Sequence, residues 1–287
     1  MTPANTIQST INYIKKELAE LYHARETESM AYILLEYVLN YSKNQIQLNR
    51  TENIGEDHFK QIDTYTQELK TSKPIQYILG ETEFYDLTFK VNEHTLIPRQ
   101  ETEELVHAII KENQQKALHI LDIGTGSGCI PISLAKNIQN AHVSSADISA
   151  EAIEKAKENA LLNQVDINFF HRDILNWKKF DWDNFDIIVS NPPYVTEAEK
   201  CKMDKNVLDH EPHTALFVSD HDPLIFYRTI AEFALQYLKK EGKLYFEINE
   251  SLGREMVELL EQKGFAKIRL LQDINGKNRM VSAIKSH

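Results

Sequence analysis

Hydrophobic residues in the first quarter of the chain recur at spacings of three and four residues. Such spacings place the side chains on one face of each of three helices. Residues 1–73 are therefore predicted to form a small helical bundle, in which the polar tract 41–55 is a connection or a short extra helix. The apolar positions are Ile7, Ile11, Ile14, Leu18 and Leu21; Met30, Ile33, Leu34, Tyr37 and Val38; and Phe59, Ile62, Tyr65 and Leu69.

No cluster of ionisable residues with the spacing of a ligand set occurs in this helical region. We therefore expect residues 1–73 to recognise a partner rather than to carry chemistry. A domain that only stabilises the rest of the chain is an equally good interpretation.

After Pro74 the apolar residues alternate with polar ones, as in a strand. Leu79, Phe84, Leu87 and Phe89 follow this pattern, with Gly80 and Asp86 as turn residues. Residues 74–95 are predicted to be a β-hairpin linker.

From residue 96 onward, short apolar strands alternate with helical segments, which is typical of an α/β fold with a parallel sheet. Asn275-Gly276 separates the last two strands and indicates a hairpin there. Residues 96–287 are predicted to form a seven-stranded Rossmann-like sheet with an antiparallel final strand. The predicted strands are 118–123, 142–146, 167–170, 185–189, 243–248, 267–272 and 280–284.

Composition and net charge limit the classes of protein to which this chain can belong. The chain has 287 residues, of which 42% are apolar and 26% charged, as in a soluble globular protein. A formal net charge of −11 argues against general nucleic-acid binding, because phosphates attract basic surfaces. Apolar runs are too short for a membrane span, and Cys129 and Cys201 make no disulfide framework, so a cytoplasmic location is expected.

A glycine-rich loop follows the first predicted strand of the sheet. Asp122 and the segment Gly124-Thr125-Gly126-Ser127-Gly128 have the spacing D-x-G-x-G-x-G, and Cys129 stands where a dinucleotide loop requires its third glycine. This spacing indicates S-adenosylmethionine. The glycines let the backbone approach the ribose and the methionine part of the cofactor, and Asp122 can meet the methionine ammonium.

The next two predicted strands also end in candidate cofactor contacts. Asp147 can hold both ribose hydroxyls, an interpretation that we favour over an ordinary aspartate at a strand end. Asp173 can accept the adenine amino group and Ile174 can pack on the ring, although a surface aspartate is nearly as good an interpretation of position 173.

The fourth predicted strand ends in Asn191-Pro192-Pro193-Tyr194. The two prolines fix their own φ angles, so the loop is stiff. The Asn191 side-chain oxygen and the Pro192 carbonyl can each accept one hydrogen of an –NH₂ group, and Tyr194 offers a flat face to a planar group. The substrate atom is therefore predicted to be an –NH₂ nitrogen on an sp² carbon. A Pro-rich turn with only a structural role is the alternative.

The polar stretch 196–222 is long enough to be a flap that faces the substrate. His210 and His213 within it invite a metal interpretation, but proline interrupts their spacing and a third ligand is missing. No metal site is predicted. Glu211-Pro212 instead suggests an anchor for this loop.

These motifs together resemble the PrmC/HemK family of bacterial release-factor glutamine methyltransferases. Leu96-Ile97-Pro98-Arg99, Glu101-Thr102-Glu103, the glycine loop, the Asn-Pro-Pro-Tyr segment and Glu211-Pro212 all match, and the likeness covers nearly the whole chain. Gln100 departs from the family's usual proline.

The resemblance implies a class I methyltransferase fold and methylation of the glutamine in the Gly-Gly-Gln loop of class 1 peptide chain release factors. The methyl donor would be S-adenosylmethionine, leaving S-adenosylhomocysteine. It assigns cofactor contacts to Gly124–Gly128, Asp147, Ile174 and Asn191. It assigns the substrate to Asn191–Tyr194. We also expect Arg99 to contact the substrate.

Three alternatives stay open at this point: a ribosomal-protein glutamine methyltransferase, an adenine-N6 nucleic-acid methyltransferase, and a non-catalytic binding protein of the same fold. The acidic composition fits a nucleic-acid substrate poorly. The intact glycine loop and Asn-Pro-Pro-Tyr segment argue against a non-catalytic role.

Overall fold

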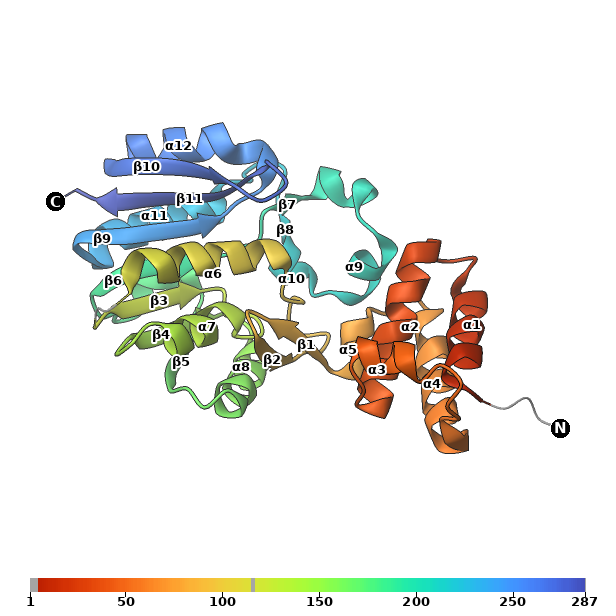
Figure 1. Ribbon diagram of the computed structural model, residues 1–287. Helices are drawn as coiled ribbons and strands as arrows, with labels where there is room; N and C mark the ends of the chain where they lie inside the picture. Colours follow the sequence, from red (N-terminus) through yellow and green to blue (C-terminus); the bar gives the residue numbers. More distant parts are fainter. Residues whose placement is uncertain (1–4, 115–116, 287) are drawn as a thin grey trace. The chain divides into compact units, whose positions relative to one another are not determined.

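The computed structural model describes residues 5–114 and 117–286, which divide into two compact units (Figure 1). The first unit is the chain as far as Gly80 together with Lys205–His210. The second comprises Glu81–Asp204 and Glu211–His287.

The first unit is a helical bundle around a core that includes Ile7, Ile14, Leu34 and Ile62, all with no exposed surface. The three predicted helices are present, and the polar tract between the second and third contains a short helix. The unit consists of α1 (Ile7–Leu18), α2 (Ala24–Leu39), α3 (Lys43–Leu48), α4 (Gly55–Leu69), α5 (Ile75–Leu79) and α9 (Lys205–His210).

Three residues expected on the buried faces, Leu21, Ile33 and Tyr37, are exposed. Leu21 lies beyond the end of α1, so it no longer follows the helical period of that segment. On α2 the buried stripe runs through Ala31, Leu34 and Leu35, which leaves Ile33 and Tyr37 outside it. The helical pattern was therefore right and its phase slightly wrong.

The segment 74–95 is only partly a hairpin. Pro74 caps the short helix α5, where its missing N–H costs no hydrogen bond, and Gly80 ends that helix at a φ of +74°. The hairpin follows as β1 (Glu81–Phe84) and β2 (Leu87–Lys90). Alternation between two apolar positions, Tyr77 and Leu79, cannot distinguish a strand from one helical turn, so the strand expected there was wrong.

The second unit contains a seven-stranded sheet of strand order β10-β11-β9-β6-β3-β4-β5. Its strands are parallel except β11, which is antiparallel to both neighbours, so the predicted sheet is confirmed. The strands are β3 (His119–Ile123), β4 (His142–Asp147), β5 (Ile167–His171), β6 (Phe185–Ser190), β9 (Leu238–Glu247), β10 (Phe265–Gln272) and β11 (Asn278–Lys285).

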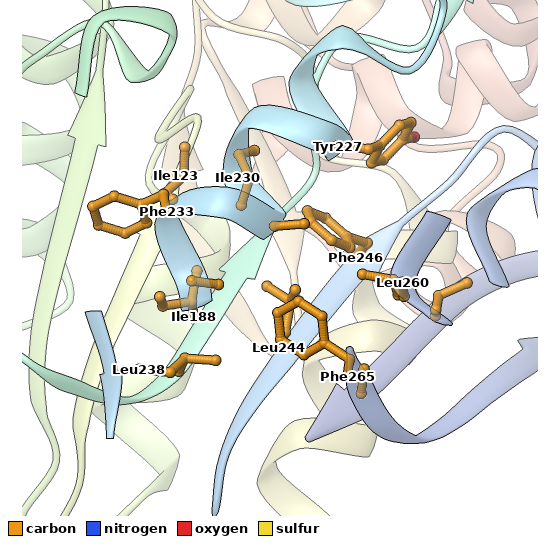
Figure 2. Packing of buried hydrophobic residues seen from close by; sticks show 14 of the residues in the cluster. Ile123, Ile188, Tyr227, Ile230, Phe233, Leu238, Leu244, Phe246, Leu260 and Phe265 are labelled. Carbon is orange, nitrogen blue, oxygen red and sulfur yellow. The ribbon is translucent and has the colours of Figure 1, made fainter. Parts of the chain in front are cut away.

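Helices cover both faces of this sheet, because successive strand residues point to opposite sides. Ile187 belongs to the cluster formed with residues of α6, α7 and α8. Its neighbour Ile188 belongs to the opposite cluster, with Ile230 of α11 and Leu260 of α12 (Figure 2). The remaining elements are α6 (Gln100–Asn113), α7 (Cys129–Asn137), α8 (Ala150–Leu162), α10 (His213–Leu216), α11 (Ile225–Tyr237), α12 (Gly253–Gln262), the 3-10 helices η1 (Ile174–Lys179), η2 (Glu197–Lys202) and η3 (Glu250–Leu252), and the short strands β7 (Val195–Thr196) and β8 (Phe217–Val218).

Parallel strands end at the same edge of a sheet. β3, β4, β5 and β6 therefore deliver the glycine loop, Asp147, Asp173 and Asn191 to one edge. The segment 196–222, expected as a polar flap, contains η2, α9, α10 and the β7–β8 pair.

Candidate active site

A cavity of about 370 Å³ lies at this edge of the sheet, within the second unit. It gathers residues from four separate parts of the predicted site, and its lining is mostly apolar. Of the predicted residues, it is lined by Gly124, Gly126, Asp147, Asp173, Ile174, Asn191, Pro192 and Pro193. Lining residues that were not predicted include His94, Leu96, Phe217 and Phe226.

The glycine loop bends back over the end of β3. Gly124 N–H donates to the Ala146 carbonyl at 2.9 Å, and Gly126 N–H donates to Asp147 Oδ2 at 2.9 Å. A Cβ at Gly126 would meet no atom within 4 Å, so open space lies above the loop at this point. A ligand can therefore approach the backbone closely there.

Gly128 has a different role from Gly126. Its φ is +84°, and a Cβ there would lie 2.8 Å from Ile132 Cδ1 and 3.1 Å from the Ala156 Cβ. Gly128 is thus required where the loop enters α7 and packs against α8. It does not line the cavity.

Asp147 is fixed in place by the backbone. Its two carboxylate oxygens accept from Gly126 N–H and Ser149 N–H, both at 2.9 Å, and burial raises the pKa of the carboxyl group. Because each oxygen has a further lone pair and the residue lines the cavity, Asp147 can accept two hydroxyl groups from a ligand.

Asp122 lies behind the cavity wall with no exposed surface. Its Oδ2 accepts from the Ser145 hydroxyl at 2.6 Å, while its Oδ1 has no hydrogen-bond partner within residues 5–114 and 117–286. Burial raises the pKa of Asp122 to about 7, and the nearby Asp147 carboxylate contributes to the rise. An unpartnered buried carboxylate oxygen fits a cationic group of a ligand, such as an ammonium.

Thr125 and Ser127 do not line the cavity. Both side chains are buried, and the Thr125 hydroxyl lies 2.5 Å from the Ser145 hydroxyl, which in turn donates to Asp122. The side chains of these two loop residues therefore lie away from the ligand space, and their role as cofactor contacts stays a prediction.

Asp173 and Ile174 lie side by side on the cavity wall at the start of η1. Asp173 caps this helix: Oδ1 accepts from Leu175 N–H at 2.8 Å and Oδ2 from the Asn176 side chain at 2.6 Å. Ile174 is buried and presents an apolar surface. The capping bonds hold both residues in place while each Asp173 oxygen keeps a lone pair.

Asn191 is one of the polar residues that line the cavity. Its Nδ2 donates to the Thr102 hydroxyl of α6 at 3.3 Å, and that hydroxyl donates to Glu247 Oε2 at 2.6 Å. The Tyr194 hydroxyl donates to Glu247 Oε1 at 3.2 Å. Glu247 is 1% exposed, and burial raises its pKa, although the bonds from Thr102 and Tyr194 oppose the rise.

Tyr194 lies on the core side of the loop. Its side chain packs against the cluster that contains Tyr227 and Phe246 and does not line the cavity, whereas Pro192 and Pro193 do. The predicted stacking of Tyr194 on the substrate remains a prediction. Burial and the neighbouring Glu247 raise the pKa of the Tyr194 hydroxyl.

Arg99, expected to contact the substrate, is engaged elsewhere. Its Nη2 donates to Glu211 Oε1 at 2.5 Å, and the Ile97 N–H donates to Glu211 Oε2 at 3.3 Å. The Glu211 side chain is 1% exposed. This ion pair fastens the loop after Tyr194 to the segment before α6, in agreement with the anchor suggested by Glu211-Pro212, and Arg99 does not line the cavity.

His210 and His213 do not converge on a common point. His210 Nε2 lies 3.3 Å from the Thr71 carbonyl within the first unit, and the His213 ring packs on Phe217. Over the described part of the chain, no three His, Cys, Asp or Glu side chains lie close enough together to bind a metal ion. In residues 5–114 and 117–286, no helix is both long and apolar enough to cross a bilayer.

Thr102 and Glu247, which form the hydrogen-bond chain behind Asn191, were not predicted as site residues from the sequence. Thr102 was noted only as part of the Glu101-Thr102-Glu103 match. Glu247 carries a signal that could have found it, because it is a charged residue that directly follows the apolar run 244–246 at the carboxyl end of β9.

Two family models match the chain: the PrmC N-terminal domain over residues 9–80 and the methyltransferase small domain over residues 100–213. Among solved structures, the chain is similar to the ribosomal protein L11 methylase of Lactobacillus delbrueckii subsp. bulgaricus, with a TM-score of 0.50, 22% identity, and coverage of 67% of this chain and 82% of that one. A methyltransferase from Pyrococcus furiosus gives a TM-score of 0.53 at 16% identity, covering 80% of this chain and 99% of that one. These likenesses show the class I methyltransferase fold.

Curated relatives are much more similar in sequence. The release factor glutamine methyltransferase of Flavobacterium psychrophilum is 52% identical over 268 residues, which cover 92% of this chain and 94% of the relative. That of Bacteroides thetaiotaomicron is 41% identical over 271 residues, covering 94% and 97%. Identity at this level over nearly the full length shows that this chain belongs to the release factor glutamine methyltransferase family.

Proposed function

We propose that this protein transfers a methyl group from S-adenosylmethionine to the side-chain amide nitrogen (N5) of the glutamine in the Gly-Gly-Gln loop of class 1 peptide chain release factors. The single observation that carries the proposal is the position of Asn191. Asn191 lines the same cavity as Gly124 and Asp147, and its Nδ2 donates to the Thr102 hydroxyl.

The residues present fit the cofactor. Asp147 can accept the two ribose hydroxyls, Asp173 and Ile174 suit an adenine ring, and the open space above Gly126 admits the donor close to the backbone. Asp122 has no exposed surface and does not line the cavity, so its contact with the cofactor ammonium stays a prediction. When bound, S-adenosylmethionine supplies a methyl group activated by its positively charged sulfur.

The chain's own contribution is orientation. Asn191 Oδ1 and the Pro192 carbonyl each accept one hydrogen of the substrate –NH₂, which directs the nitrogen toward the donor. Both oxygens also stabilise the positive charge that develops on this nitrogen during transfer. An amide nitrogen is too weak an acid to lose its proton first near neutral pH, so the proton leaves to water afterwards and no strong base is required.

We further propose that the helical unit, matched by the PrmC N-terminal domain over residues 9–80, recognises the release factor, with residues 96–287 as the methyltransferase domain. The net charge of −11 supports a protein substrate rather than a direct nucleic-acid one. A soluble protein that meets release factors acts in the cytoplasm, and neither a membrane nor a metal enters the proposal.

A labelling experiment tests the substrate. The protein is incubated with methyl-labelled S-adenosylmethionine and, separately, a class 1 release factor, its Gln→Ala loop variant, ribosomal proteins, or duplex DNA. Label is expected in the release factor alone, and mass spectrometry of its peptides is expected to place one methyl group on the loop glutamine. Label in ribosomal protein or DNA, or in the Gln→Ala variant to the same extent, would contradict the proposal.

A further inference from the structure

The two ends of the Asn191 carboxamide are chemically different, and only one of them can receive a substrate –NH₂. Oδ1 accepts hydrogen bonds, whereas Nδ2 only donates them and would oppose the substrate's own N–H groups. The torsion that exchanges the two ends is soft and roughly two-fold, so a carboxamide without a fixed partner populates both orientations. Something must select the one with Oδ1 toward the cavity.

The contacts behind Asn191 make this selection through a chain of hydrogen bonds. The Thr102 hydroxyl has one proton, which it donates to Glu247 Oε2 at 2.6 Å. Its oxygen can then only accept a further bond, and the group 3.3 Å away is Asn191 Nδ2. The direction of each bond follows from its neighbour, because an ionised carboxylate accepts and never donates.

Water does not replace these contacts easily. Thr102 is 3% exposed and Glu247 is 1% exposed. Glu247 Oε1 accepts the Tyr194 hydroxyl at 3.2 Å, so both carboxylate oxygens are engaged by hydroxyl donors. Arg279 provides a favourable charge nearby. Burying a charged carboxylate costs free energy. The buried Glu247 carboxylate fixes the direction of the hydrogen bonds that run from Asn191 through Thr102.

We propose that Glu247 and Thr102 are positioning residues that hold the Asn191 carboxamide with Oδ1 toward the cavity and thereby select an –NH₂ substrate. Neither side chain lines the cavity, so both act through Asn191. The inference rests on the proposed function for its reaction, and on the hydrogen-bond geometry alone for the orientation.

Two substitutions of Thr102 separate the hydroxyl from the shape of the side chain. Thr102→Val keeps the shape and removes the hydroxyl, and Thr102→Ser keeps the hydroxyl. In Thr102→Val, kcat for the release factor is expected to fall about tenfold, which is about 1.4 kcal/mol. The KM for the release factor and the Kd for S-adenosylhomocysteine are expected to change little, while Thr102→Ser stays close to the wild type in all three constants.

A merely structural role for Thr102 would produce a different result. Wild-type kcat in Thr102→Val, or an equal loss in Thr102→Ser, would overturn the proposal. So would a loss in Thr102→Val that appears wholly in the Kd for S-adenosylhomocysteine.

A second measurement does not depend on the variants or on the reaction. In the wild-type protein, NMR exchange of the Asn191 side-chain amide protons with solvent is expected to be slower than that of Asn275, whose side chain is exposed. Equal exchange at the two positions would overturn the proposed orientation. Failure of the wild-type protein to methylate a release factor would refute the proposed function instead, and the exchange measurement would still decide the orientation.

Discussion

Replacing Asp122 with asparagine is expected to flatten the pH dependence of stability in the ligand-free protein. Burial raises the pKa of Asp122 to about 7 in the folded state, whereas an unfolded aspartate titrates at about 3.9. Between these values the folded protein binds more protons than the unfolded chain. The stabilising contribution of Asp122 is therefore fully present below about pH 4 and is lost as the pH rises through about 7.

The magnitude follows from the difference in pKa. A difference of about three corresponds to about 4 kcal/mol, of which about 3 kcal/mol is lost between pH 5 and pH 8. In Asp122→Asn the side-chain oxygen can still accept from Ser145, and the Nδ2 takes the place of the unpartnered Oδ1. The cost of that buried donor is the same at every pH, so it changes the level of the curve and not its slope.

The assay is urea unfolding of both proteins at several values between pH 5 and pH 8. The two proteins share every other titratable group, so the difference between their curves reports Asp122 together with its electrostatic interaction with Asp147. The wild type is expected to lose about 3 kcal/mol more than the variant over this range. Parallel curves would show that the Asp122 carboxyl titrates normally in the folded state, which would refute the reasoning.

Further predictions concern the loops around the cavity. Gly128→Ala is expected to cost about 3 kcal/mol in urea unfolding, because its Cβ clashes with α7 and α8 and its φ is positive. Gly126→Ala is expected to cost about 1 kcal/mol and mainly to weaken S-adenosylhomocysteine binding, measured by calorimetry. Equal losses of stability in the two variants would contradict this prediction. Arg99→Ala leaves the buried Glu211 carboxylate unpaired and is expected to lower the free energy of unfolding by about 2 kcal/mol. Arg99→Lys is expected to keep most of the wild-type stability. An unchanged unfolding midpoint in Arg99→Ala would show that the ion pair does not hold the loop. Tyr194→Ala is expected to cost about 3 kcal/mol through lost packing, and Tyr194→Phe much less; similar losses in both would assign the effect to the hydroxyl.

The parts of the fold that follow from local periodicity could be predicted from the sequence. Ile187 and Ile188 alternate between two covered faces, which a continuous apolar run in a parallel sheet requires. Once the sheet was inferred, the placement of Asp147 and Asn191 at one edge followed from the shared direction of the strands.

The partners of these residues could not be predicted, because they are set by contacts between distant segments. Arg99 pairs with a residue 112 positions away, and Thr102 bonds to one 145 positions away. A sequence pattern shows that Arg99 is charged and not whether its charge is already neutralised by Glu211. The orientation of Tyr194 toward the core likewise depends on the packing of α11, which no local pattern specifies.

The account depends most directly on Asn191, and one measurement tests it. Methyl transfer to a class 1 release factor is compared for the wild type and Asn191→Ala, together with the Kd of each for S-adenosylhomocysteine. The variant is expected to lose at least about a hundredfold in kcat, because a preorganised hydrogen-bonding group aimed at the reacting atoms is removed, while its Kd changes far less. A variant that methylates the release factor at nearly the wild-type rate would contradict the central claim.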